Sequence, residues 1–162
     1  MRRSVLIALG VAIALVLGGQ PARAVAPDRT PIPPFHDTFA KGLVCPFSVG
    51  VDQLRINETL TVLSNGRVFL TGNSVQRVTN LDNGKSVVVN ASGPFTLTSA
   101  GGVDTFTARG RNLWTFFAGA LGPGEPAALL LTSGLAIFTV SASGITFTHN
   151  GGTTENLCDT LR

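Results

Sequence analysis

The sequence contains few of the residues from which most active sites are built. Among its 162 residues are two cysteines, two histidines, one tryptophan and no tyrosine. The cysteines form no Cys-x-x-Cys pair, and His36 and His149 are distant in sequence, so a zinc site is not indicated. The aspartates lack the spacing of a calcium loop, and no glycine pair follows a strand and opens a helix to bind phosphate. These absences predict a protein that is not an enzyme and holds no metal and no cofactor.

Long apolar runs are also rare, and the one clear run lies at the N-terminus. Residues 6–18 carry no charge and follow Arg2 and Arg3, and Ala22-Arg23-Ala24 is a small-x-small cleavage site. This pattern predicts a signal peptide at residues 1–24, cleaved after Ala24, by either the general or the twin-arginine export route. The run is short for a bilayer span, so we expect no membrane span after cleavage and a secreted or wall-associated protein.

An excess of either charge is missing from the expected mature chain. The full sequence has 12 basic and 9 acidic side chains, and loss of Arg2, Arg3 and Arg23 leaves equal numbers. The remaining basic residues are scattered, so neither nucleic acid nor an anionic membrane is an expected partner.

The two cysteines predict one disulfide, between Cys45 and Cys158. An even count in an exported chain favours a bond, and only one pairing exists. It would join the first strand of the domain to the last and close a very long loop. Two free thiols or a metal pair are the alternatives.

Proline divides the mature chain into two parts. Residues 25–40 contain Pro27, Pro31, Pro33 and Pro34, which cannot donate to a helix or a sheet ladder. We therefore predict an extended N-terminal tether at 25–40 and one β domain at 41–162.

The domain reads as short apolar runs separated by turn residues, and no stretch keeps a helical period for long. Asn65-Gly66, Asp82-Asn83-Gly84 and Gly101-Gly102 each lie between two such runs and predict β-hairpins. Ser133-Gly134 is interpreted as another hairpin turn. Roughly nine or ten strands of this spacing predict an all-β, antiparallel up-and-down meander, barrel-like, with a two-sheet β-sandwich as the alternative. Several strands are apolar on both faces, so a homo-oligomer is another possibility.

Several segments resemble a family of small secreted β-rich proteins of actinobacteria. The segments are residues 78–86 with 92–94, Gly110-Arg111-Asn112-Leu113, residues 130–134 and Asn156-Leu157-Cys158-Asp159. The resemblance implies export, a β fold and the terminal disulfide. It assigns no activity, so no catalytic residue is carried over.

One local cluster could bind a ligand. Arg109 and Arg111 flank a glycine shortly before Trp114, and this combination of cations and an aromatic ring could stack a sugar or another flat ligand. The simpler interpretation is a core tryptophan with two solvent-facing arginines.

Other candidates for catalysis are weaker. The neighbours His36-Asp37 lie in the tether, His149 opens a turn where a solvent-facing side chain is normal, and Ser133 lacks the Gly-x-Ser-x-Gly elbow. A carboxylate pair of a glycosidase would require Asp52 or Glu58 to meet Asp104 in the fold.

These observations predict an exported, non-enzymatic structural or interaction protein of the cell envelope or extracellular space. One alternative is a β-barrel carrier of a small apolar ligand, held in its interior. The other is a hydrolase with an unrecognised site.

Overall fold

The computed structural model describes residues 26–162, so the expected signal peptide lies outside the described residues. In chain order the elements are β1 (Asp28–Pro31), β2 (His36–Phe39), β3 (Val49–Val62), β4 (Val68–Asn80), β5 (Ser86–Asn90), β6 (Phe95–Ala100), β7 (Val103–Arg109), β8 (Asn112–Phe116), β9 (Ala128–Thr132), β10 (Leu135–Ser141), β11 (Gly144–Asn150), β12 (Thr154–Asn156) and α1 (Leu157–Thr160). The predicted all-β, antiparallel class is confirmed, whereas the short α1 and the strands β1 and β2 were not foreseen.

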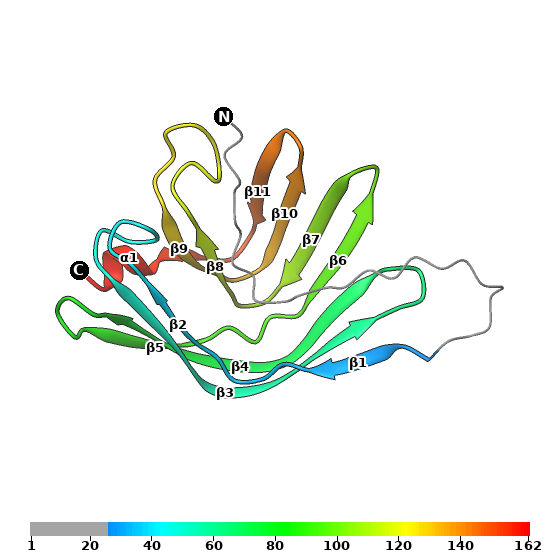
Figure 1. Ribbon diagram of the computed structural model, residues 1–162, viewed down its shortest axis with the longest axis horizontal. Helices are drawn as coiled ribbons and strands as arrows, with labels where there is room; N and C mark the ends of the chain where they lie inside the picture. The colour runs from blue at the N-terminus through cyan, green and yellow to red at the C-terminus, as the bar shows by residue number, and fades with distance from the viewer. Residues whose placement is uncertain (1–25) are drawn as a thin grey trace.

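The predicted hairpins form where the turn residues stand. β3 pairs with β4 across Asn65-Gly66, β4 with β5 across Asn83-Gly84, and β6 with β7 across Gly101-Gly102. Gly66 and Gly84 take φ values of 80° and 78°, the left-handed region that glycine enters without strain. In Figure 1 the β6–β7 and β10–β11 hairpins rise from the long, curved β3–β4 hairpin.

The proline-rich segment does more than tether the domain. β1 and β2 both pair with the long strand β3, with Asp28 opposite Val62 and Phe39 opposite Val49. The prediction that residues 25–40 make no ladder bonds is therefore wrong. Proline is tolerated there because β1 and β2 pair on one side only, so an N–H can be missing on the solvent side.

Nine strands form one large sheet and three form a small one, and neither closes. The backbone path of the large sheet is β1-β3-β4-β6-β7-β10-β11, with β2 on β3 and β5 on β4, and the small sheet is β12-β9-β8. β1 and β11 end the path, so the sheet does not close into the barrel that the barrel-like prediction favoured. β8 contacts β10 and β11 through aromatic side chains and not through backbone pairing, so the sheet stays open.

The Ser133-Gly134 turn is a crossover between sheets and not the expected hairpin. β9 pairs with β8 and β12, whereas β10 pairs with β7 and β11. The Ser133 N–H donates to the Thr153 carbonyl at 2.8 Å, and Gly134 has a φ of 95° with the Gly151 backbone close against it. A side chain at 134 would meet that backbone, which explains why glycine is required at the crossover.

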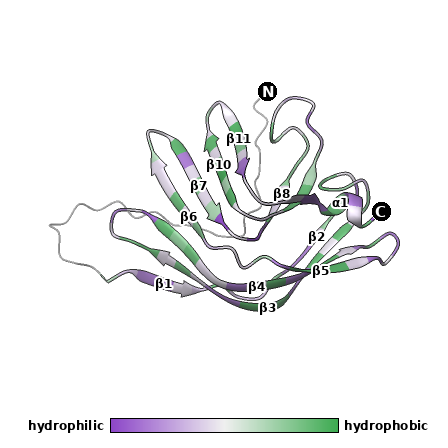
Figure 2. Ribbon diagram, turned by 180° about the vertical axis from the view of Figure 1, so that it is seen from behind, coloured by the Kyte–Doolittle hydropathy of each residue, from purple (hydrophilic) through white to green (hydrophobic). Residues whose placement is uncertain are grey.

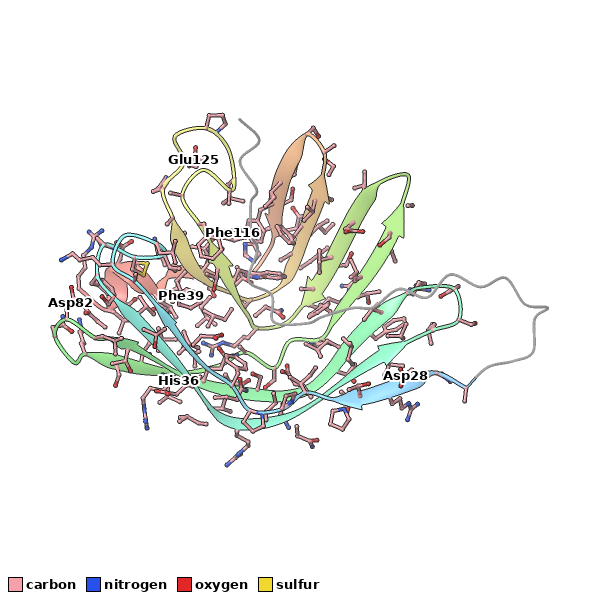
Figure 3. All side chains as sticks on the ribbon, in the orientation of Figure 1. Asp28, His36, Phe39, Asp82, Phe116 and Glu125 are labelled. Atoms are coloured by element: carbon pink, nitrogen blue, oxygen red, sulfur yellow. A yellow bond between two sulfur atoms is a disulfide. The ribbon has the colours of Figure 1, made fainter. Side chains whose placement is uncertain are left out.

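The small sheet is buried on both faces, which explains why β8 and β9 are apolar without alternation. On one face Leu113, Leu129 and Leu131 join the core formed by β3, β4, β5 and α1. On the other face Trp114 and Phe116 contact Phe138 and Phe147. Figure 3 shows Phe39 and Phe116 on the inner side of the fold, between the large sheet and β8.

The predicted Cys45–Cys158 disulfide is present, with a Cα–Cα distance of 5.4 Å. Its ends lie beside the expected strands and not within them: Cys45 precedes β3, and Cys158 lies in α1 after the last strand. Cys45 and Cys158 are both buried, together with Val44 and Leu157, in the core between the small sheet and β3, β4, β5 and α1. The bond closes a loop spanning 113 residues in sequence, which stabilises the fold by about 4–5 kcal/mol in the chain-entropy model.

Within residues 26–162 no helix is both long and apolar enough to cross a bilayer.

Candidate functional site

The Arg109–Arg111–Trp114 cluster is divided between the surface and the core. Both arginines are exposed and flank Gly110, whose φ is 73°. Trp114 is half-buried, with its ring 6.0 Å from the rings of Phe138 and Phe147, and its Nε1 donates to Thr132 Oγ1 at 3.0 Å. The structure gives Trp114 a packing role, and ligand binding by the three residues stays a prediction.

His149 is held by two neighbours and does not face solvent as expected. The half-buried imidazole donates from Nε2 to the Ser133 carbonyl oxygen, and Nδ1 lies 3.0 Å from Thr154 Oγ1. With Nε2 as donor, Nδ1 accepts from the threonine hydroxyl. These bonds tie β11 to the crossover and to β12.

Ser133 is not positioned as a nucleophile for His149. Its hydroxyl lies 3.0 Å from Thr153 Oγ1 and accepts from the Thr153 N–H at 2.8 Å, whereas His149 contacts the carbonyl oxygen of Ser133. Both residues therefore hold the crossover in place.

His36 pairs with Asp52 and not with its sequence neighbour Asp37. β2 places His36 directly opposite Asp52 on β3, and the Nδ1 and Oδ1 atoms are 2.5 Å apart. The pair is exposed, and Figure 3 shows His36 on the outer side of the fold. The pair is not evident from the sequence, because the prolines of residues 25–40 predict an extended tether and no strand.

The acidic residues do not form a glycosidase pair. Val62 on β3 and Phe106 on β7 lie in the same row across the sheet. Glu58 lies four residues from that row along β3, and Asp104 lies two residues from it along β7, on the other side of the row. Six residues of extended chain separate the two carboxylates by about 20 Å along the strands. Asp104 accepts from the Ser99 hydroxyl at 2.5 Å. Partial burial raises the pKa of Glu58 above its ordinary value.

Asp82 stabilises the β4–β5 turn. The Ser48 N–H donates to Oδ1 at 3.2 Å, and Lys41 Nζ lies 3.4 Å from Oδ2. The Ser48 N–H and, secondarily, the Lys41 ammonium favour the charged form and lower the pKa of Asp82. The part of the chain that the structure describes holds no group of three or more His, Cys, Asp or Glu side chains suited to a metal ion.

A cavity of about 500 Å³ opens beside the disulfide. Val44, Pro46 and Pro126 form part of its wall, with Asp159 and Arg162 among the lining residues. These two charged side chains lie 3.5 Å apart and are directed toward each other. The cavity thus offers an apolar wall and no free charged pair for a ligand.

A regular array of threonines covers the opposite face of the large sheet from the aromatic core. We call it the threonine face and define it by two rows of four positions on β6, β7, β10 and β11. The rows are Thr96, Thr107, Ile137, Thr148 and Thr98, Thr105, Thr139, Thr146. Between them, the inward row Leu97, Phe106, Phe138, Phe147 enters the core. Figure 2 shows hydrophobic and paler residues mixed along the β6–β7 and β10–β11 hairpins.

The threonine face was not predicted, although the sequence carries a signal for it. Three strands of the face contain Thr-x-Thr, at residues 96–98, 105–107 and 146–148. Alternation places both threonines of each motif on one face of its strand. Only strand order and register bring the motifs side by side.

Comparison with known protein families, with curated proteins and with solved structures finds no match to this chain.

Proposed function

We propose that this protein is exported and acts outside the cytoplasm as a non-enzymatic interaction protein. The observation that carries the proposal is the Cys45–Cys158 disulfide, which ties the start of the domain to its last residues. A buried bond of this kind persists in oxidising surroundings and is uncommon in cytosolic proteins. The signal-peptide pattern at residues 1–24 and the resemblance to secreted actinobacterial proteins support the same location.

The arrangement of the polar side chains supports binding over catalysis. His149 and Ser133 bond to backbone and hydroxyl groups at the crossover, and His36 and Asp52 form an exposed pair on the outer side. On β6, β7, β10 and β11 the large sheet also presents the uncharged threonine face, opposite the aromatic core. The alternative of a carrier for a small apolar ligand requires a closed barrel with an interior cavity, and the large sheet is open.

Export is tested by expressing the full-length chain in a secreting bacterial host. We expect the protein in the medium or bound to the wall, with Val25 as its first residue and no alkylatable thiol without reduction. The matched control is Leu15→Arg, which places a charge in the apolar run and should retain the chain inside the cell. Cytosolic accumulation of the unmodified chain with two free thiols would overturn the proposal.

A further inference from the structure

The threonine face is distinguished by three properties. Seven of its eight positions are threonine, and the eighth is Ile137. None of the seven hydroxyls takes part in a hydrogen bond among residues 26–162, whereas those of Thr132, Thr153 and Thr160 are bonded. Thr146 and Thr148 are exposed and the other five threonines are half-buried, so the hydroxyls of this face remain available to a partner outside the protein.

The array is regular in two directions. Neighbouring strands are about 4.7–4.9 Å apart, and residues two apart along a strand are about 6.6–6.8 Å apart. Threonine is stiff about its first side-chain torsion, so its methyl and hydroxyl repeat with the backbone. The face therefore presents a lattice of threonine side chains, each of which carries one methyl and one hydroxyl group.

The charge on this face restricts the partner. The eight positions carry no charge, and Asp104, the one acid in the four strands, lies on the inner face beside Ser99. Arg109 is on the outer face but lies beyond Thr107, outside the two rows. An uncharged array is complementary to an uncharged surface, because a charged partner would lose its hydration without gaining an opposite charge.

The two-dimensional order restricts the partner further. A single polymer chain would follow one line of the array, whereas a crystal face repeats in both directions and can meet all eight positions at once. A crystalline polysaccharide exposes sugar rings that stack on aromatic side chains, and the two rows contain none. Ice exposes rows of water oxygens with repeats of similar size, and threonine hydroxyls can hold water in such rows.

We propose that the threonine face binds the surface of ice. This inference rests on the proposed function, since an exported protein is the one that meets ice outside the cell. The hydroxyls anchor ordered water, and the methyl groups fill the spaces between. Many weak contacts engaged together hold the protein on the crystal.

The test uses the secreted, disulfide-bonded protein in an ice-recrystallisation assay and in adsorption of the fluorescently labelled protein to a growing ice surface. Thr105→Tyr and Thr139→Tyr each place a ring within the array while keeping a residue that favours strands. Thr71→Tyr is the matched control, an exposed strand position on β4 outside the two rows. Urea unfolding of each variant verifies that the fold is retained.

We expect the unmodified protein and Thr71→Tyr to inhibit recrystallisation at micromolar concentration and to adsorb to ice. Each variant within the array should lose about tenfold or more of this activity, because a raised ring prevents simultaneous contact. Activity of the unmodified protein no greater than that of albumin would overturn the inference, as would equal loss in all three variants. Retention on insoluble cellulose or chitin without adsorption to ice would overturn it as well. None of these results bears on export or on the disulfide, so failure of the ice-binding inference is distinguishable from failure of the proposed function.

Discussion

The indole Nε1 of Trp114 donates to Thr132 Oγ1 at 3.0 Å and links β8 to β9. Thr132 is 2 % exposed, so water cannot replace its hydroxyl as a partner. The bond fixes the ring that contacts Phe138 and Phe147, and thereby joins the small sheet to the large one.

Removing this acceptor should destabilise the protein. Thr132→Val keeps the shape of the side chain but leaves the indole N–H without its partner, at a cost of about 1–3 kcal/mol. Thr132→Ser, which keeps the hydroxyl, should lose less. Urea unfolding followed by the fluorescence of the single tryptophan measures both variants, and equal stability of Thr132→Val and the unmodified protein would contradict the role of this bond.

Loss of the disulfide should lower the free energy of unfolding by about 3–5 kcal/mol. The reason is that the unfolded chain regains the freedom of a loop spanning 113 residues in sequence. Cys45→Ala combined with Cys158→Ala is the appropriate change, since both side chains are buried. The unmodified protein unfolded under reducing conditions provides the comparison, and a double variant as stable as the oxidised protein would refute the prediction.

Gly84 should not tolerate a β-branched residue. Its φ of 78° is in the left-handed region, and its N–H donates to the Asn80 carbonyl at 2.8 Å. Nothing lies within 4 Å of a side chain built there, so the cost of Gly84→Val is backbone strain of about 1–3 kcal/mol. Gly84→Asn is the control, because asparagine enters this region more readily. Matching urea midpoints for the Val and Asn variants would show that backbone strain is not what selects glycine here.

Glu58 should make stability depend on pH. Burial raises the pKa of its carboxyl in the folded state, so this group favours folding below its unfolded pKa and loses that contribution as pH rises through its folded pKa. Glu58→Gln should therefore unfold at a higher urea concentration than the unmodified protein at about pH 7 and match it at about pH 3.

Glu125→Gln controls for the loss of one negative charge, since Glu125 lies exposed in the loop between β8 and β9. A gain in the Glu125 variant equal to that of Glu58→Gln would assign the effect to net charge and not to burial.

Local sequence determined the antiparallel β class, most of the tight turns and the single cysteine pairing. Polar and apolar residues alternate in 59–63, and Gly66 and Gly84 adopt the left-handed backbone conformation of tight turns. Each feature depends on only a few neighbouring residues, so it can be predicted without knowledge of the fold. With only two cysteines, Cys45 had no other intramolecular partner than Cys158. The sequence also limited the chemistry, because scattered acids and two distant histidines offer no ready-made site.

Only the tertiary structure decided which strands are neighbours when no tight turn joins them. Two similar apolar runs around Ser133-Gly134 predict a hairpin, but β9 and β10 enter different sheets because their aromatic and leucine side chains fill two separate cores. Register likewise placed His36 opposite Asp52 and aligned the threonines of β6, β7, β10 and β11 into two rows. Strand pairing depends on contacts between residues far apart in sequence. Alternation within a strand therefore shows which side chains share a face, but it does not show which other strands lie beside that strand in the sheet.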